Sequence, residues 1–287
     1  MKFAFIKERL RSFPADVSCD VLEVSRSGYY AWAARPSGGV RQRRRAELLM
    51  KVRATHAANR AVYGSPRVCA ALRAAGERVS ENTVARVMRE HGIRAKTKKT
   101  YVPRTTDSVH QQPVAANVLD RQFTAELPDQ KWAVDITYVP TDQGWLYLAG
   151  VIDLCSRRIV GWSMAEHMRV ELVSDALSMA LARRTPGRGL LHHSDRGVQY
   201  ASEDYRKLLD DHGMARSMSN KGDCWDNAVM ESFWSTLKTE LVNHECYATH
   251  AQARQSIFEY IEVFYNRQRL HSSLGYLSPE AFEASLN

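Results

Sequence analysis

The chain has 287 residues, which at about 100–200 residues per domain favours more than one domain. Hydrophobic residues make up 44% and charged residues 25% of the chain, so a disordered, collagen-like or low-complexity protein is excluded. Residues 1–110 carry 23 Lys and Arg against 9 Asp and Glu, whereas residues 111–287 carry 17 against 23. A basic front half joined to a mildly acidic back half indicates an arm for a polyanion beside a separate chemical unit.

The cysteines and the apolar stretches bear on the compartment. The 5 cysteines are widely spaced and form no C-x-x-C or Cys/His cluster of zinc-finger type, and scattered thiols are typical of cytosolic proteins. The longest internal apolar stretch, residues 146–152, is far shorter than the roughly 20 residues of a membrane-spanning helix. The apolar run at residues 3–6 is too short for a signal peptide. The sequence therefore predicts a cytoplasmic protein without a membrane segment.

The first 100 residues show helical patterns. Residues 16–35 predict two short helices with Ser25 as the cap of the second, and a basic helix with Arg43 and Arg44 in its first part fades around residues 56–60. Residues 66–76 and a segment capped by Ser80, residues 81–91, predict two helices joined by a turn. This is the helix-turn-helix pattern, and it places Arg86 and Arg89 on the helix that would contact DNA. An ordinary pair of short helices around a glycine remains the alternative.

From residue 131 the hydrophobic period changes from helical to strand-like. The segment before it, residues 97–130, contains three prolines and only a short helical patch at residues 117–123. Strands are expected at 131–139, 145–153, 158–164, 190–194 and 215–219, and helices at 169–184, 203–212, 226–242, 250–271 and 279–286. The order βββαβαβα predicts an α/β fold with a mixed sheet covered by helices.

Three acidic residues occupy notable positions in this pattern. Asp135 lies in the middle of the first strand, Asp195 directly follows the fourth strand, and Glu231 lies in the second turn of the helix after the fifth. Carboxylates so placed can hold two divalent cations about 3.5–4 Å apart, as in phosphodiester displacement, and their hard oxygens suit magnesium. The alternatives are that Asp195 only starts a turn or pairs with Arg196, and that Glu231 and Lys238 belong to a solvated helix face.

Taken together, ordered motifs carry a resemblance to a known family. They are residues 132–138 (WAVDITY), 192–200 (HHSDRGVQY) and 219–233 (SNKGDCWDNAVMESF), with 35 residues between Asp195 and Glu231 and Lys238 seven after Glu231. Residues 25–32 (SRSGYYAW), 63–67 (YGSPR), 265–267 (YNR), 270–276 (LHSSLGY) and 278–280 (SPE) also match. The chain resembles the DDE transposases of bacterial insertion sequences, specifically the OrfB product of the IS-three family, relatives of retroviral integrases.

The resemblance implies a fold and a chemistry. The fold is a ribonuclease H-like catalytic domain preceded by an all-α helix-turn-helix region, in which Asp135, Asp195 and Glu231 bind two Mg²⁺ ions, with Mn²⁺ as a substitute. The reaction is nicking at the transposon end to release a 3′ hydroxyl, which then attacks another phosphodiester, so the enzyme serves DNA integration and recombination. Residues expected to contact DNA are Lys238, Asn220, Lys221, Asn227, Arg86, Arg89, Arg43 and Arg44. A nuclease that cuts without joining, and a DNA-binding regulator, are the competing functions.

The resemblance also implies domains and partners. The expected division is 1–60 (N-terminal helical region), 61–100 (helix-turn-helix), 101–125 (linker), 126–245 (catalytic core) and 246–287 (C-terminal helical extension). The partners are DNA, as transposon ends and target, and further copies of the chain on that DNA, in the nucleoid. The family's upstream-frame product, OrfA, is expected as fusion or partner, because the sequence shows no sustained heptads of its own.

Overall fold

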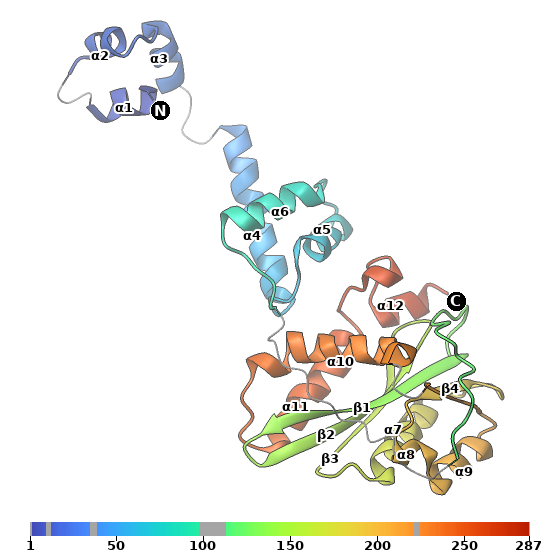
Figure 1. Ribbon diagram of the computed structural model, residues 1–287. Helices are drawn as coiled ribbons and strands as arrows, with labels where there is room; N and C mark the ends of the chain where they lie inside the picture. The colour runs from blue at the N-terminus through green and yellow to red at the C-terminus, as the bar shows by residue number, and fades with distance from the viewer. Residues whose placement is uncertain (1, 10–12, 35–38, 98–112, 221–223, 287) are drawn as a thin grey trace.

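A computed structural model describes residues 2–9, 13–34, 39–97, 113–220 and 224–286 of the chain (Figure 1). The α/β fold predicted from the sequence, a mixed sheet preceded by an all-α region, is confirmed. In the described ranges no helix is both long and apolar enough to cross a membrane.

The chain begins with a small unit of three helices, α1 (Lys2–Arg9), α2 (Ala15–Val21) and α3 (Arg26–Ala33). The Ser25 hydroxyl accepts a hydrogen bond from the backbone N–H of Gly28 at 3.0 Å, so the predicted cap of α3 is confirmed. Helix α1 was not predicted, because its apolar run is only four residues long, yet Ile6 from α1 is fully buried beside Cys19 and Tyr29. The core of this unit is therefore small.

A second helical unit follows, consisting of α4 (Val40–Ala58), α5 (Ser65–Ala74) and α6 (Glu81–Glu90). The Ser80 hydroxyl accepts a hydrogen bond from Thr83 N–H at 3.3 Å and so caps α6 as predicted. Gly76 and Gly92 follow α5 and α6 with φ of +87° and +65°, a conformation that favours glycine at helix ends. Hereafter residues 40–97 are called the α4–α6 unit.

The sheet has five strands in the spatial order β3-β2-β1-β4-β5. The strands are β1 (Lys131–Thr141), β2 (Gly144–Asp153), β3 (Ile159–Ala165), β4 (Leu191–Ser194) and β5 (Ala215–Met218). Strands β1, β2 and β3 pair antiparallel as a meander, whereas β4 pairs parallel with both β1 and β5, so the sheet is mixed as predicted. The central strand β1 is thus flanked on both sides.

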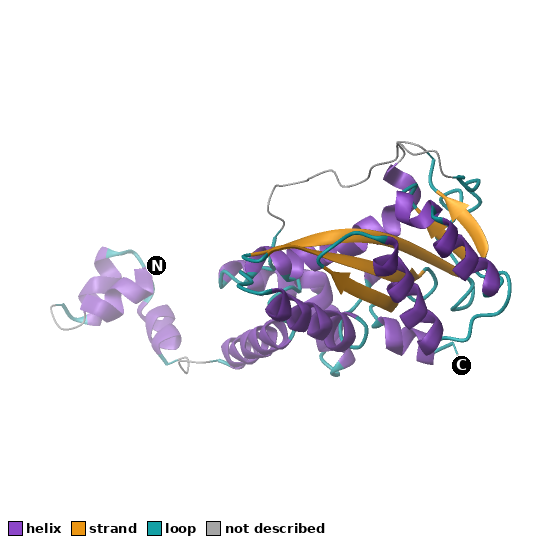
Figure 2. Cartoon of the chain, turned by 90° about the horizontal axis from the view of Figure 1, so that it is seen from below, coloured by secondary structure: helices purple, strands orange, loops and turns teal. Residues whose placement is uncertain are grey.

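Helices cover both faces of the sheet (Figures 1 and 2). One core joins the sheet to α7 (Val170–Arg183), α8 (Val198–Ala201) and α9 (Glu203–Asp211). The other core joins it to α10 (Ala228–Glu240), α11 (His250–Phe258), the π-helical turns Glu259–Tyr265 and the α4–α6 unit. Helix α12 (Pro279–Ala284) lies near the end of the chain.

Three expectations about local structure were wrong. The helical patch at residues 117–123 is a turn, because Asp120 and Arg121 have φ of +42° and +59° and the Asn117 side chain accepts the Asp120 N–H at 3.0 Å. The helix expected at 226–242 begins at Ala228, after a 3-10 turn, Cys224–Asn227. The helix expected at 250–271 is α-helical only to Phe258 and continues as π-helix to Tyr265.

Candidate active site

Asp135 and Asp195 belong to neighbouring segments of the sheet. In the parallel pair β1–β4, Ala133 lies opposite His193, and Asp135 and Asp195 each follow two residues later in the chain. The Asp135 carboxylate faces α10, where the indole Nε1–H of Trp234 donates to its Oδ2 at 3.0 Å. Glu231 lies one turn before Trp234 on the same helix. Two strands and a helix therefore direct three acidic side chains toward one region.

The environment of the three acids shifts the pKa values of two of them. Burial raises the pKa of Asp135 well above its ordinary value, and the charges of Asp195 and Glu231 raise it further. Burial also raises the pKa of Glu231, although this side chain is largely exposed. Three carboxylates that oppose each other's ionisation are stabilised by a cation between them, and their hard oxygens match the preference of Mg²⁺.

The carboxylates are not yet assembled as a metal centre. Within the part of the chain that the structure describes, no three His, Cys, Asp or Glu side chains stand close enough to hold a metal ion without rearrangement. The chemistry of the donor set fits a divalent cation, because it offers carboxylates from three separate segments: strand β1, the turn after β4 and helix α10. The exposed Glu231 is the member with most freedom to move toward the other two.

The turn after β4 fixes Asp195. The backbone N–H of Gly197 donates to Asp195 Oδ1 at 2.9 Å, so Asp195 does start a turn, as one alternative expected. The neighbouring Arg196 directs its Nε–H to the Ser219 carbonyl at 2.6 Å. The turn holds one carboxylate oxygen and thereby orients the side chain.

Lys238 does not lie on a plain solvated face. Its ammonium sits 4.8 Å from the centre of the Tyr138 ring, and the side chain is half-buried. Burial lowers the pKa of Lys238, while the charge of Asp135 acts in the opposite direction, so the lysine faces the carboxylates. A cation beside these acids is placed to meet a phosphate that approaches them.

The polar sequence of the loop before α10 suggests side chains that face DNA, but one of them, Asn227, points into the protein. Asn227 is buried, and its amide Nδ2–H donates to the Val134 carbonyl at 3.0 Å, so the side chain points into the protein next to Asp135. Asn220 is exposed, and its backbone N–H donates to Asp226 Oδ2 at 2.8 Å. Lys221 lies outside the described residues. Of the two residues predicted to contact DNA that the structure describes in this loop, Asn220 lies at the surface and Asn227 does not.

The α4–α6 unit presents the basic residues that were expected to contact DNA. Arg86 and Arg89 are exposed on α6, and Arg43 and Arg44 are exposed near the start of α4. The ridge of α6 that contains Val84, Val87 and Met88 packs inward, which leaves the arginine face free of the core.

Sequence reasoning missed the residues that support the site. Asp226 accepts hydrogen bonds from Arg121 Nε at 3.0 Å and Asn117 Nδ2 at 2.9 Å, in addition to the Asn220 N–H. Burial would raise the pKa of Asp226, but these donors, with the Arg121 charge, hold it below the ordinary value. Because its partners come from a distant segment, only the motif WDN pointed to this residue.

His193, beside the catalytic strand ends, is a structural residue in this fold. Its Nδ1 and Nε2 lie 2.8 Å from Ser217 Oγ and 3.2 Å from Ser219 Oγ. Burial lowers the pKa of His193 to about 4, so the ring is neutral at physiological pH. The imidazole thus ties β4 to β5. Asp153 at the end of β2 also has a structural role, because its carboxylate accepts the backbone N–H groups of Asp129 and Ser156 at 2.7 and 2.8 Å.

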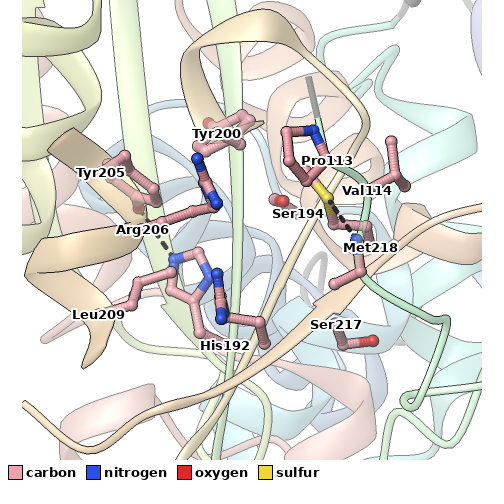
Figure 3. A pocket seen from close by; sticks show the side chains of 12 residues that line it. Pro113, Val114, His192, Ser194, Tyr200, Tyr205, Arg206, Leu209, Ser217 and Met218 are labelled. Carbon is pink, nitrogen blue, oxygen red and sulfur yellow. Dashed lines mark hydrogen bonds between the residues drawn. The ribbon is translucent and has the colours of Figure 1, made fainter. Parts of the chain in front are cut away.

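A pocket of about 390 Å³ lies elsewhere, beside β4 and β5 (Figure 3). It is lined by His192, Tyr205, Arg206 and the segment from Pro113, and none of the three carboxylates contributes to its wall. The His192 Nε2 and the Tyr205 hydroxyl lie 2.9 Å apart, and burial lowers the pKa of this histidine to about 3. The three carboxylates therefore lie outside the pocket wall, although Ser194, next to Asp195, and Tyr200, on which the charges of Asp135 and Asp195 act, both line it.

Comparisons with known proteins match this arrangement. A family model described as an integrase core domain matches residues 125–224, a second integrase core domain model matches 212–279, and a model of an HTH-like domain matches 43–101. The transposase InsF for insertion sequence IS3A of Escherichia coli K12 is 45% identical over 284 residues, which is 99% of this chain and 98% of that one. The chain belongs to the IS3 family of transposases. It combines an integrase core with an HTH-like domain and acts in DNA transposition.

A second relative has a comparable identity, and one solved structure aligns with part of the chain. An uncharacterized 31 kDa protein of insertion element IS600 from Shigella sonnei is 46% identical over 265 residues, 92% of this chain and 96% of that one. Among solved structures, a chain of the simian T-cell lymphotropic virus intasome aligns with a TM-score of 0.47 at 14% identity, covering 75% of this chain and 69% of that one.

Proposed function

We propose that Asp135, Asp195 and Glu231 are the catalytic carboxylates of this transposase and hold two Mg²⁺ ions, which Mn²⁺ can replace. The observation that carries the proposal is that Asp135, buried in β1 next to β4, has its pKa raised by burial and by the negative charges of Asp195 and Glu231. The reaction is nicking at the transposon end followed by attack of the released 3′ hydroxyl on a second phosphodiester. Bound cations would lower the pKa of the attacking hydroxyl or water and stabilise the leaving oxygen.

The protein's own groups position this chemistry. The Trp234 indole N–H donates to Asp135 Oδ2, and the Gly197 N–H donates to Asp195 Oδ1, so each hydrogen bond orients a carboxylate that would hold a cation. Lys238 would neutralise a phosphate at the site. No covalent intermediate with the protein is required, because the attacking group is a water or a DNA hydroxyl.

The proposal extends to DNA contacts and partners. The α4–α6 unit would bind the DNA backbone through Arg43, Arg44, Arg86 and Arg89. The loop before α10 would contact the DNA end through Asn220, Lys221 and Asn227. Further copies of the chain on DNA, and an OrfA product as fusion or partner, complete the assembly. We retain the division 1–60, 61–100, 101–125, 126–245 and 246–287 and a cytoplasmic, nucleoid-associated location as parts of the proposal.

Junction PCR tests the proposal in cells that carry the element with its natural flanks. Glu231→Gln removes a charge with little change in volume, so joined transposon ends should be lost at least 100-fold. Glu171→Gln, on the exposed face of α7, is the charge-matched control and should leave joining unchanged. Joining at the wild-type level in Glu231→Gln would refute the role of Glu231.

Two further outcomes separate the competing functions. Cut ends without joined products in the wild type would favour a nuclease, and DNA binding without cutting would favour a regulator. A readout independent of turnover is metal binding itself. Mg²⁺ should raise the melting temperature of the wild-type protein at neutral pH, and this increase should shrink in Glu231→Gln.

A further inference from the structure

Two sequence motifs that the active site does not use meet in the structure. One is residues 63–67 at the start of α5, and the other is the C-terminal segment from residue 265. The Arg67 Nε–H donates to the Leu270 carbonyl at 2.8 Å, and the Leu270 N–H donates to the Tyr63 hydroxyl at 2.8 Å. The Tyr63 hydroxyl in turn donates to the Gln268 carbonyl at 3.3 Å. More than 200 residues of sequence separate these partners, so the contact joins distant parts of the chain.

Glu240, the last residue of α10, is the centre of this contact. Its carboxylate accepts hydrogen bonds from Arg269 Nε at 2.8 Å, Arg269 Nη2 at 2.7 Å and the Tyr260 hydroxyl at 2.7 Å. The α4–α6 unit reaches the same residue: Lys96 Nζ donates to the Glu240 carbonyl at 3.1 Å, and Arg67 Nη1 lies 4.0 Å from the carboxylate. Tyr63, Arg67, Lys96, Glu240 and Arg269 are called the docking junction below.

The centre of the docking junction is buried. Glu240 and Arg269 are 6% and 4% exposed and Tyr63 is fully buried, while Arg67 and Lys96 are partly buried at its edge. A buried ion pair gains little stability over apolar packing, because desolvation offsets its attraction, but it demands one geometry. Around it, Val62 and Tyr63 belong to the same hydrophobic core as Tyr260 and Ile261. The α4–α6 unit is therefore packed against the catalytic unit and not merely tethered to it.

Helix α10 links the docking junction to the candidate active site. Helix α10 carries Glu231 in its first turn and Glu240 at its end, about 14 Å apart at 1.5 Å per residue. A helix transmits displacement along its axis as a rigid rod. Through Glu240, the same helix thus connects a candidate catalytic carboxylate to the α4–α6 unit, whose residues Arg86 and Arg89 are exposed on α6. Figure 1 shows the places of α10, α4 and α6.

We propose that the docking junction holds the α4–α6 unit at a fixed distance from the active site, so that the DNA segment bound by α6 determines which phosphodiester is cut. Arg67 and Lys96 are then positioning residues that act through Glu240. This inference rests on the proposed function, because it assigns a spacing role to a protein that cuts DNA with Glu231.

The decisive measurement is the position of the cut on a supercoiled plasmid that carries the whole element, mapped at nucleotide resolution. The wild type should cut at one position at each end. The double variant Arg67→Met/Lys96→Met should spread its cuts over several neighbouring positions while total cutting stays within about threefold. Arg94→Met, an exposed neighbour of Lys96, should keep the single position, and Lys96→Arg, which keeps the donor, should do so too.

Hydrogen exchange reports on the junction without DNA. Peptides covering residues 228–241 and 265–277 should exchange at least tenfold faster in the double variant than in the wild type and in Arg94→Met. A single cut position in the double variant would overturn the spacing role, and so would unchanged exchange. Absence of any cut by the wild type would instead refute the proposed function, and the exchange data would still show whether the junction holds the two units together.

Discussion

Gly150 gives the sharpest test of how Asp135 is held. It lies opposite Asp135 in the β1–β2 register, and a Cβ built on it would stand 2.9 Å from Cη2 of Trp234 and 3.3 Å from Cε of Met230. Ordinary van der Waals contact begins at 3.4 Å, so the Trp234 ring is too close by about 0.5 Å. The same ring donates the hydrogen bond to Asp135 Oδ2. Gly150→Ala should therefore displace the group that orients the carboxylate.

The magnitude follows from two alternative costs. If the ring stays, overpacking costs about 1–3 kcal/mol. If the ring moves, the hydrogen bond to the carboxylate is weakened, at about 1.5–3 kcal/mol. Moving the Trp234 ring relieves the steric overlap but weakens the hydrogen bond to Asp135, so one of the two costs always remains. We therefore expect a loss of about 2 kcal/mol in the free energy of unfolding, which lowers the melting temperature by roughly 4–8 °C.

A double-mutant cycle provides the assay. Trp234→Phe removes the ring atom that clashes, so adding it to Gly150→Ala should cost less than the sum of the single changes by at least about 1 kcal/mol. Gly187→Ala is the matched control, because a Cβ there meets nothing within 4 Å. Transposon end cutting by Gly150→Ala should fall at least tenfold. Strict additivity in the cycle, with normal cutting by Gly150→Ala, would refute the reasoning.

Three other predictions follow from charges. Burial and the charge of Asp195 raise the pKa of Asp135, so the protonated carboxyl stabilises the fold below the ordinary carboxyl pKa, and this stability is lost as pH rises through the raised pKa. Asp135→Asn should therefore raise the melting temperature of the metal-free protein at neutral pH and flatten its dependence on pH. A melting temperature below that of the wild type would contradict this. Arg269→Met should lower the free energy of unfolding in urea by about 3–5 kcal/mol, because it leaves the buried charge of Glu240 without its partner. Adding Glu240→Leu should restore most of this free energy. A double variant as unstable as the single variant would exclude an unpaired buried charge as the cause. Arg86→Gln with Arg89→Gln should reduce the slope of log DNA affinity against log salt by about 1.8, measured by fluorescence anisotropy, whereas an unchanged slope would remove α6 from the interface.

The sequence predicted the sheet because its signals were local. Alternation in residues 131–139 and the short turns between the first three strands specify an antiparallel meander without knowledge of the rest of the chain. The pairing of β4 beside β1 is different, because it depends on a crossover and on the burial of both sheet faces. Only the resemblance to a known family predicted that Asp195 and Asp135 would meet there.

Helix α10 shows where periodicity is insufficient. The spacing of residues on this helix placed Glu231 and Lys238 away from the apolar stripe. Catalytic residues and ordinary solvent-facing residues can both take such positions, so the spacing does not distinguish them. The contact of Lys238 with the Tyr138 ring, and the charge effect of Glu231 on Asp135, come from the strand beneath the helix. Likewise, the docking junction combines residues 63–67 with residues 240 and 269, and no pattern within either segment indicates its partner.

Unpaired groups gather where the carboxylates lie. Among the described residues, three buried side-chain atoms lack a hydrogen-bond partner, and two of them belong to Tyr200 and Asn227. Asn227 holds the carbonyl next to Asp135, while burial, followed by the charge of Asp135, raises the pKa of Tyr200 well above its ordinary value. An unpaired buried hydroxyl costs stability, so sequences usually avoid it except where function requires it.

Tyr200→Phe tests this interpretation. Removing a hydroxyl that has no partner should leave the metal-free protein as stable as the wild type or more stable, by up to about 1 kcal/mol in thermal unfolding. The same change should weaken the stabilisation that Mg²⁺ confers, if the hydroxyl finds its partner only when the carboxylates close around a cation. A metal-free variant less stable than the wild type would mean that the Tyr200 hydroxyl already has a hydrogen-bond partner in the folded chain. The hydroxyl would then not lower the stability of the metal-free protein.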